Sequence, residues 1–241
     1  MIVIPMAGQS SRFFKAGYSL PKFMLPCHGK AVFDWALASF GKYYDTEHFV
    51  FVVNSELSKE YVSERITSIG IKFFDILIMD APSLGQADTV DYALSKLEDY
   101  DGELYIFNID TYRRDFVKPV NLGDIDGYLE VFEGVGDHWS FALTRSCNND
   151  DVIRVAEKER ISNLCSNGLY YFSSAKLFRR LVSHQREKGI SEWSKGELYI
   201  APLYNLMIRE GLKVSVVHVD VKLMTFIGTP QEYEDFCKVL P

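Results

Sequence analysis

The sequence lacks the long apolar runs and the excess of basic residues that mark two common classes of protein. Its longest apolar runs, HFVFVV and FFDILIM, are far shorter than the roughly 20 residues that a membrane-spanning helix needs. Lys and Arg number 26 against 33 Asp and Glu, which gives a net charge of -7. We therefore expect no membrane segment and no general attraction to nucleic acid or to anionic membranes.

Cysteine is scarce and scattered. The four cysteines (Cys27, Cys147, Cys165 and Cys237) form no CxxC pair, and none of the five histidines stands at metal-ligand spacing from them. This pattern favours free thiols in a reducing compartment. The chain opens on an apolar strand rather than on a secretory signal, so we expect a cytoplasmic protein.

Linkers rich in proline or glycine, internal repeats and low-complexity tracts are absent as well. With 241 residues, of which 47% are hydrophobic, the chain can bury a sizeable core. We expect a single domain, residues 1–241, with two functional halves that cover residues 1–115 and 116–241.

In the first half, apolar segments of strand length alternate with segments of helical pattern. The predicted strands are 1–5, 48–54, 73–79 and 103–110, and the predicted helices are 31–44, 56–70 and 87–97. Ser55 can cap the second helix and Gly70 can end it. Strands that are apolar throughout and separated by helices predict an α/β fold, with a mainly parallel central sheet and helices on both faces.

The second half has a different pattern. Four closely spaced strand-like segments, 127–133, 139–145, 152–158 and 168–174, are antiparallel in character. Helices are predicted at about 175–188 and 198–210, followed by a strand over 213–221. A closing helix over 229–240 has Thr229 as its cap and Pro230 in its first turn.

The loop after the first strand has almost nothing with which to fill a core, since its residues are Met6, Ala7, Gly8, Gln9, Ser10 and Ser11. Ligands of an open parallel sheet bind beyond the carboxyl ends of its strands, where this loop lies. Its small residues let backbone amides approach phosphate oxygens. Arg12 adds bidentate hydrogen bonds and Lys22 a mobile charge. We therefore expect a polyphosphate site here, although neither standard phosphate-binding motif is present.

These residues open a series of motifs that runs along nearly the whole chain. The series is PMAGQSSR, PK at 21–22, GK at 29–30, LGQADTV at 84–90, NID at 108–110, EK at 157–158, NGLYYF at 167–172, GELYIAPLYNLMIREG at 196–211 and IGTP at 227–230. In order and spacing it resembles the nucleotidyltransferases that join a nucleoside monophosphate to a phosphorylated sugar or alcohol. The resemblance implies a Rossmann-like fold of the type that these enzymes share with A-type glycosyltransferases, with an antiparallel acceptor-binding portion in the second half.

The resemblance also implies the reaction and the residues on its nucleotide side. A phosphate oxygen of the acceptor attacks the α-phosphorus of a nucleoside triphosphate, and pyrophosphate leaves. As catalytic residues, Arg12 would stabilise the departing pyrophosphate and Lys22 the charge around the α-phosphate. Gln86 and Ala87 would line the base pocket, while Asp88 would cap the helix that contains it.

Mg²⁺ is the cofactor that the resemblance implies. Asp110 ends the fourth predicted strand, where a carboxylate can reach a metal that bridges the phosphates. Family members usually carry a second metal-binding aspartate two residues before the glycine of GTP, but this chain has Phe226 there. Either Asp220 completes the metal shell, or the metal relies on Asp110, phosphates and water.

On the acceptor side, the resemblance assigns the acceptor's phosphate to Lys158. Asn167, Gly168 and Glu197 would contact the body of the acceptor, and Gly168 would permit its close approach. For Asn167 and Glu197, a purely structural role is an alternative.

The opening form IPMAGQSSRFFKAGYSLPK resembles a branch from bacterial capsule and lipopolysaccharide gene clusters, close to the choline-phosphate and phosphoglutamine cytidylyltransferases. The resemblance implies transfer of CMP from CTP to a small phosphorylated acceptor, with L-glutamine phosphate as the first candidate, in capsule biosynthesis. The alternatives are a sugar-1-phosphate nucleotidyltransferase, a glycosyltransferase on a similar fold and a non-catalytic nucleotide-binding protein. The sequence leaves the oligomeric state open, a homo-oligomer included.

Overall fold

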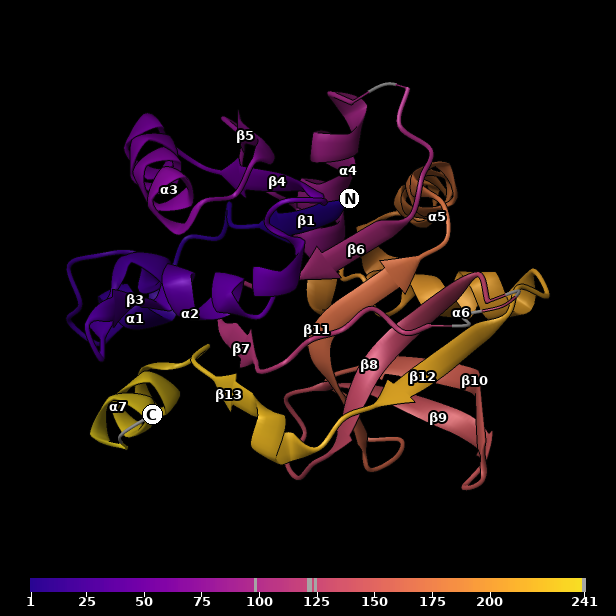
Figure 1. Ribbon diagram of the computed structural model, residues 1–241. Helices are drawn as coiled ribbons and strands as arrows, with labels where there is room; N and C mark the ends of the chain where they lie inside the picture. The colour runs from indigo at the N-terminus through magenta and orange to yellow at the C-terminus, as the bar shows by residue number, and fades with distance from the viewer. Residues whose placement is uncertain (98, 121–122, 124, 240–241) are drawn as a thin grey trace.

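The structure, a computed structural model, describes residues 1–97, 99–120, 123 and 125–239. Its centre is a nine-stranded mixed sheet with the strand order β5-β4-β1-β6-β11-β8-β12-β10-β9 (Figure 1). These strands are β1 (Ile2–Pro5), β4 (His48–Val53), β5 (Phe73–Ile78), β6 (Leu104–Phe107), β8 (Gly127–Glu133), β9 (Ser140–Ser146), β10 (Asn149–Glu157), β11 (Leu164–Phe172) and β12 (Val214–His218). The α/β class predicted from the sequence is confirmed.

The sheet is parallel in its first half and mixed in its second half. β5, β4, β1 and β6 are parallel neighbours. β11 pairs antiparallel with both β6 and β8, β9 and β10 are antiparallel, and β12 is parallel to β8. Because Phe107 at the end of β6 lies opposite Leu169, the loop that follows β6 begins beside β11.

Helices cover both faces of the sheet. They are α1 (Ser11–Lys15), α2 (Val32–Ala38), α3 (Glu56–Ile69), α4 (Gln86–Ser95), α5 (Ala175–Glu187), α6 (Leu203–Arg209) and α7 (Pro230–Lys238). Residues of α4, α5 and α6 share one buried cluster with the sheet, and residues of α2 and α3 share another. Within β1, Val3 belongs to the first cluster, while Ile2 and Ile4 belong to the second. This alternation is expected of a strand with both faces covered, and each such side chain contributes about 1.5–3 kcal/mol.

Many element boundaries follow the sequence patterns, but the helix predicted over 31–44 already ends at Ala38. Ser55 caps α3 through a hydrogen bond from Ser58 N, and Gly70 ends α3 with a φ of 83°, both as predicted. The helix predicted over 198–210 begins only at Leu203, because Leu198 instead makes backbone hydrogen bonds to residues 84 and 87. β6 ends at Phe107, so Asp110 lies in the following loop rather than in the strand. Leu240, the last residue of the predicted closing helix, lies outside the described residues.

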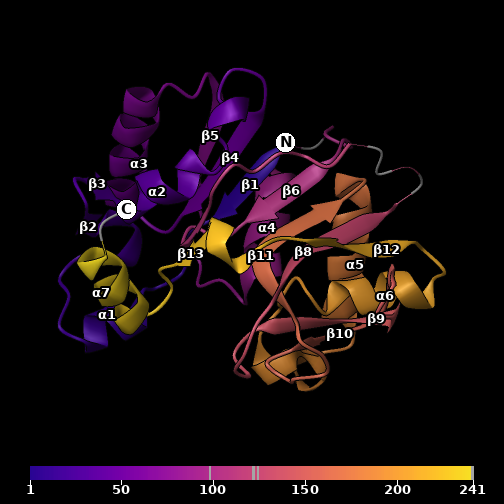
Figure 2. The ribbon, with the colours of Figure 1, turned by 60° about the horizontal axis from the view of Figure 1, so that its bottom comes forward.

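The C-terminal segment returns to the first half of the chain. β13 (Met224–Phe226) pairs antiparallel with β7 (Thr111–Arg113). α7 begins with a capping box at Thr229 and lies beside α1 (Figures 1 and 2). Phe13 of α1 and Tyr233 of α7 pack edge to face, with their ring centroids 6.2 Å apart. Segments from the two ends of the sequence therefore pack together in one part of the structure.

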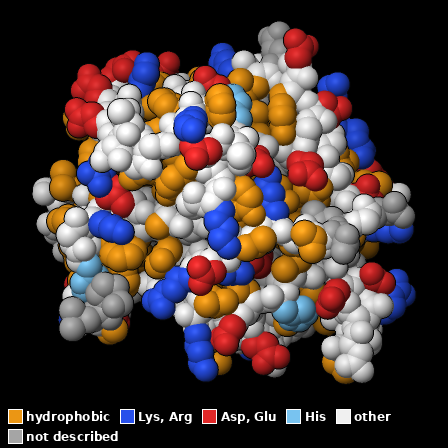
Figure 3. Space-filling view, in the orientation of Figure 1, with side chains coloured by type: hydrophobic (Ala, Val, Ile, Leu, Met, Phe, Trp, Pro, Cys, Tyr) orange, Lys and Arg blue, Asp and Glu red, His pale blue; other side chains and the backbone are white. Residues whose placement is uncertain are grey.

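The surface mixes charges of both signs. On the face shown in Figure 3, acidic and basic side chains are interspersed rather than gathered into one field. None of the described helices is long and apolar enough to cross a membrane.

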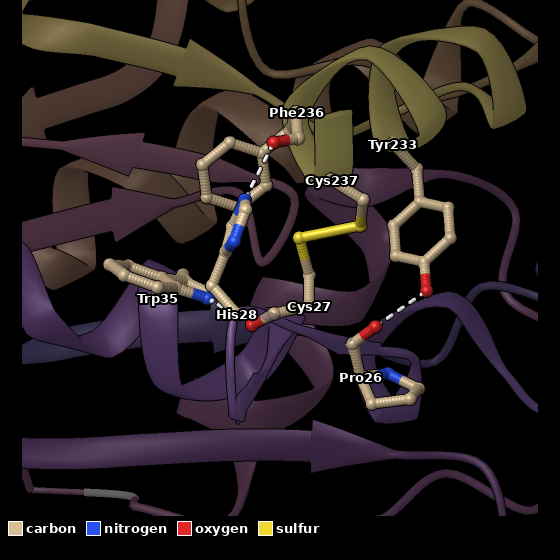
Figure 4. The surroundings of a disulfide bond; sticks show 7 residues. All are labelled: Pro26, Cys27, His28, Trp35, Tyr233, Phe236 and Cys237. Atoms are coloured by element: carbon tan, nitrogen blue, oxygen red, sulfur yellow. Dashed lines mark hydrogen bonds between the residues drawn. A yellow bond between two sulfur atoms is a disulfide. The ribbon is translucent and has the colours of Figure 1, made fainter. Parts of the chain in front are cut away.

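A disulfide joins Cys27 to Cys237, whose Cα atoms are 5.5 Å apart (Figure 4). Cys27 lies in β2 (Pro26–Cys27), which pairs with β3 (Lys30–Ala31), and Cys237 lies in α7. Beside the bond, Tyr233 donates a hydrogen bond to Pro26 O at 2.7 Å. The prediction of four free thiols is therefore wrong for this pair, because residues so distant in sequence meet only through the fold. The other two cysteines, Cys147 and Cys165, are free.

Replacing Cys237 with serine should lower the stability of the protein. The bond closes a loop with a sequence separation of 210 residues, and the chain-entropy model assigns about 5 kcal/mol to a loop of that size, as an upper value. We expect the thermal unfolding midpoint, followed by circular dichroism without reductant, to fall by several degrees. Cys147→Ser, which removes an exposed free thiol, is the matched control. Equal midpoints for Cys237→Ser and the unmodified protein would show that the bond adds no stability.

Candidate active site

Two cavities adjoin beyond the carboxyl ends of β1 and β6. The smaller cavity, of about 200 Å³, lies against the loop after β1. The larger cavity, of about 290 Å³, is lined from α1, β9, β10, β11, β13 and α7. Gln86, Asn108 and Asp110 line both cavities. A ligand that occupied the two cavities together would therefore contact these three residues at the junction.

The opening loop forms one wall of the smaller cavity. Met6, Gly8 and Ser10 line it. Ser10 has a left-handed φ of 49°, and its hydroxyl accepts a hydrogen bond from Lys22 N at 3.1 Å. The space around Gly8 is open, since a Cβ there would have no neighbour within 4 Å. The loop residues outside the lining are Ala7, which is buried, and Gln9 and Ser11, which are exposed.

Lys22 and Asp110 form an ion pair where the two cavities meet. Lys22 Nζ lies 2.5 Å from Asp110 Oδ2, and the two side chains are 26% and 20% exposed. Lys22 begins the 3₁₀ turn η1 (Lys22–Met24), and Ile227 N holds the carbonyl of Asp110 at 2.8 Å. The sequence placed both residues in the site, and the structure brings their charged groups into direct contact.

Arg12 borders the larger cavity from α1. Tyr199 lines the same cavity. Burial is the main cause that raises the pKa of Tyr199, and the Glu197 carboxylate raises it further, while the charge of Arg12 lowers it. Arg12 is thus close enough to the opposite wall to act on it electrostatically. Basic side chains therefore line both cavities, Lys22 the smaller one and Arg12 and Lys158 the larger one.

Gln86, the first residue of α4, stands at the junction. Its Nε2 donates a hydrogen bond to Asn108 Oδ1. Ala87, the other predicted base contact, lines neither cavity: it is fully buried, and its N–H donates to Leu198 O at 2.9 Å. Gln86 is therefore the member of the pair that a nucleotide in these cavities can reach.

Lys158 and Glu157 project from the end of β10. Lys158 has a left-handed φ of 54°, and its Nζ donates a hydrogen bond to the Tyr199 hydroxyl at 2.5 Å. The Glu157 side chain is only 6% exposed and accepts a hydrogen bond from Ser140. Burial raises the pKa of Glu157, although Ser140 and Lys158 both act to lower it. The structure thus adds a buried carboxylate beside the predicted lysine.

Asn167 and Gly168 lie at a bulge in β11, between Ser166 and Tyr170. Asn167 is 2% exposed and donates a hydrogen bond to Glu130. Glu130 in turn forms a buried ion pair with Arg113 at 2.9 Å. Gly168 has a φ of 88°, and a Cβ there would lie 2.2 Å from Asn108 Nδ2. Both residues line the larger cavity, but the Asn167 side chain is engaged in the structure and only its remaining surface is free for a ligand.

Two acidic residues have roles that the sequence did not predict. Asp88 is not the cap of α4, because Gly85 occupies that position; Asp88 accepts a hydrogen bond from Leu84 N at 2.9 Å and pairs with Arg186. Asp220 is exposed, lines neither cavity and caps a short turn by accepting from Lys222 N at 2.9 Å. The structure therefore gives no support to Asp220 as a metal ligand.

Phe226 and Glu197 also differ from expectation. Phe226, at the position of the missing second aspartate, lines the larger cavity and packs against Trp139 with ring centroids 4.6 Å apart. Glu197 is exposed and lines neither cavity, but its carboxylate helps to raise the pKa of Tyr199, which lines the larger cavity. The position that binds metal in the family is thus part of an aromatic wall here.

The residues that border the larger cavity and that sequence reasoning missed include Asn108, Trp139, Tyr199 and Glu232. Asn108 and Tyr199 could have been identified from the sequence, since they belong to the motifs at 108–110 and 196–211. Glu232 completes the capping box of α7 and accepts hydrogen bonds from Gly228 N and Thr229 N at 3.0 and 2.9 Å. Trp139 had no sequence signal, because its place depends on its contact with Phe226, which is distant in the sequence.

A Rossmann-like sheet with small residues after its first strand, and with basic side chains facing a carboxylate, is typical of nucleotide-binding proteins. The chain is 44% identical to a nucleoside-diphosphate-sugar pyrophosphorylase from Vibrio cholerae RC9, with a TM-score of 0.94, over 99% of this chain and 100% of that one. The chain therefore belongs to this family of nucleotidyltransferases. No protein-family model and no curated protein matches it.

More distant solved structures share the fold. An inositol-1-phosphate CTP transferase from T. maritima is 15% identical with a TM-score of 0.74, over 98% of this chain and 94% of that one. A UTP-bound UGPase from Acinetobacter baumannii is 17% identical with a TM-score of 0.69, over 98% and 91%. At this level of identity the likeness concerns the fold alone.

Proposed function

We propose that the protein transfers CMP from CTP to a small phosphorylated acceptor and releases pyrophosphate. The observation that carries the proposal is the Lys22–Asp110 ion pair at the junction of two cavities. A reaction between two phosphorylated substrates needs one site for each, with charge-neutralising groups between them. Residues 1–115 mainly bind the nucleotide in this proposal, and residues 116–241 mainly bind the acceptor.

The residues of the nucleotide side act by position and charge. Backbone amides of the loop at Gly8 and Ser10 hold the triphosphate in the smaller cavity. Lys22 exchanges its contact with Asp110 for the α-phosphate, and Arg12, which lines the larger cavity, stabilises the leaving pyrophosphate from across the junction. Gln86 contacts the base, because an amide can both donate to and accept from a pyrimidine edge.

The residues present fit a magnesium ion that binds together with its substrates. Among the described residues, no three His, Cys, Asp or Glu side chains are placed to hold a metal by themselves. Magnesium commonly takes one or two carboxylates plus substrate phosphates. A Cβ on Gly228 would lie 2.9 Å from Asp110 Oδ2 and 3.6 Å from Glu232 Oε2, so both carboxylates border one small space. Asp110 would hold the ion with Glu232 beside it, and the bound metal would neutralise phosphate charge.

The acceptor occupies the larger cavity, with its phosphate on Lys158. L-glutamine phosphate is our first candidate, on the resemblance of the opening loop to the capsule branch. A sugar 1-phosphate is the second, supported by the 44% identity to the V. cholerae protein, whose name specifies a sugar product. A glycosyltransferase and a non-catalytic nucleotide-binding protein would release no pyrophosphate.

Pyrophosphate release tests the proposal directly. CTP, UTP, dTTP, GTP and ATP are each paired, with Mg²⁺, with L-glutamine phosphate, phosphocholine and a panel of sugar 1-phosphates. Release with CTP and a non-sugar phosphate is the expected result. Release of pyrophosphate only with a sugar 1-phosphate would show that the acceptor is a sugar phosphate rather than L-glutamine phosphate. No release with any pair would overturn the proposed reaction.

Replacing Lys158 with alanine should chiefly raise the KM for the acceptor. The lysine Nζ is held by Tyr199 at 2.5 Å within the larger cavity, and loss of one charge-assisted phosphate contact typically costs about tenfold or more in affinity. Steady-state kinetics with the acceptor varied at saturating CTP measure the effect. Lys176→Ala, at an exposed residue of α5 outside both cavities, is the control. An unchanged acceptor KM would remove Lys158 from the acceptor site.

A further inference from the structure

One end of the larger cavity is built from aromatic rings. His138, Trp139 and Phe226 line it. The centroids of Trp139 and His138 are 4.3 Å apart, those of Trp139 and Phe226 are 4.6 Å apart, and the buried Phe132 packs against both Trp139 and Phe226 at 5.2 Å. The indole N–H of Trp139 is taken by Val135 O at 3.0 Å. Trp139 and Phe226 therefore offer ring surface to a ligand rather than hydrogen-bond donors.

A buried carboxylate lines the same cavity. The Glu157 side chain is 6% exposed, and Ser140 donates a hydrogen bond to its Oε2. Lys158 Nζ lies 3.8 Å from Oε1, which is too far for a direct hydrogen bond. Lys158 instead donates to the Tyr199 hydroxyl and lies 4.4 Å from the centre of that ring. The Glu157 charge is thus buried with only partial compensation.

Binding of the acceptor would take away part of the positive charge that now stabilises the Glu157 carboxylate. In the proposed function, Lys158 turns to the phosphate of the acceptor. Glu157 then keeps its neutral partner, Ser140, and remains under the influence of a second negative charge, Glu197. A buried charge that loses its counter-ion is costly, so the bound acceptor must itself supply a positive group or strong donors.

We propose that the larger cavity selects an acceptor that carries a cationic nitrogen, with Glu157 as its counter-ion and the rings of Trp139 and Phe226 as its wall. Aromatic faces attract cations through their quadrupole. A desolvated ammonium group in this cavity would be stabilised both by the rings and by a charge-assisted contact with the Glu157 carboxylate. A neutral sugar hydroxyl can donate to Glu157 but brings no charge. The inference rests on the proposed function, because it concerns the acceptor of that reaction.

The test compares acceptors that differ only in the charged nitrogen. Phosphocholine is paired with 3,3-dimethylbutyl phosphate, in which carbon replaces nitrogen, and L-glutamine phosphate with the analogue that lacks its α-amino group. The measured quantity is kcat/KM for pyrophosphate release with CTP and Mg²⁺. In at least one pair we expect the cationic member to be favoured about tenfold or more. A ratio near one in both pairs overturns the inference, and this comparison needs no variant protein.

Glu157→Gln then identifies the counter-ion, since the amide keeps the shape and can still accept from Ser140. We expect this variant to reduce the cationic preference to near one. Glu159→Gln removes the same charge at an exposed residue that pairs with Arg154, and it should leave the preference unchanged. An undiminished preference in Glu157→Gln overturns the role of Glu157.

The two proposals fail separately. Release with neutral sugar phosphates alone would preserve the nucleotidyltransferase reaction and overturn the cationic acceptor. If no acceptor supports release, the proposed reaction fails, and isothermal calorimetry with the same matched phosphates still decides the inference. Tighter binding of the cationic member supports the inference, and equal or weaker binding overturns it.

Discussion

Lys22→Ala should lower kcat by about two to three orders of magnitude while the fold remains intact. Groups that stabilise charge developing in a transition state typically contribute on this scale. Lys22 is placed for such a role, because its Nζ is in contact with Asp110 at the junction of the two cavities. The variant leaves no deeply buried charge behind, since the Asp110 side chain is 20% exposed. Steady-state pyrophosphate release and thermal unfolding, measured on the same preparation, separate the effect on catalysis from an effect on stability.

Lys15→Ala is the matched control for Lys22→Ala. Lys15 is an exposed residue of α1 that lines neither cavity, and its loss removes the same charge from the same part of the chain. It should keep a kcat close to that of the unmodified protein. Near-normal turnover in Lys22→Ala would exclude Lys22 from the catalytic residues, and a similar loss in both variants would point to net charge as the cause.

Asp110→Asn should abolish most of the Mg²⁺-dependent activity, with a loss of about a hundredfold or more. The amide preserves the size of the side chain, and the backbone contact from Ile227 N at 2.8 Å is untouched. What is lost is the negative charge that would attract the metal. Titration of Mg²⁺ at saturating CTP should show a raised half-saturating concentration as well as a reduced maximal rate.

The control for Asp110→Asn is Asp45→Asn, at an exposed residue that pairs with Lys72 on the surface. It should titrate with Mg²⁺ like the unmodified protein. An unchanged Mg²⁺ response in Asp110→Asn would rule out Asp110 as the metal ligand, and would leave Glu232 as the next carboxylate to test in the same space.

The parts of the fold that were predictable depend on short-range patterns. Ser55 and Gly70 mark the ends of α3 because capping and a left-handed end are local properties. The helix expected over 198–210 was too long because Leu198 pairs with the loop before α4, a contact that no local pattern reveals. The disulfide escaped prediction for the same reason, since 210 residues separate its two cysteines.

The candidate site divides in a similar way. The opening loop and Lys22 lie within one stretch of sequence, and their position at one cavity could be predicted from that stretch together with the order of the strands. The aromatic wall could not, because Trp139 and Phe226 are distant in the sequence and their rings meet only in the folded protein. Asp220 was chosen for its charge and its nearness in sequence to Phe226, but its backbone turn directs its carboxylate to Lys222 N instead.

The return of β13 and α7 to the first half of the chain has a consequence for synthesis. β1 and its loop are translated before Phe226, Gly228 and Glu232, which line the larger cavity. All strands of the nine-stranded sheet precede them in the sequence. The larger cavity therefore cannot be completed until residues 226–232 have been translated and have packed against the first half of the chain.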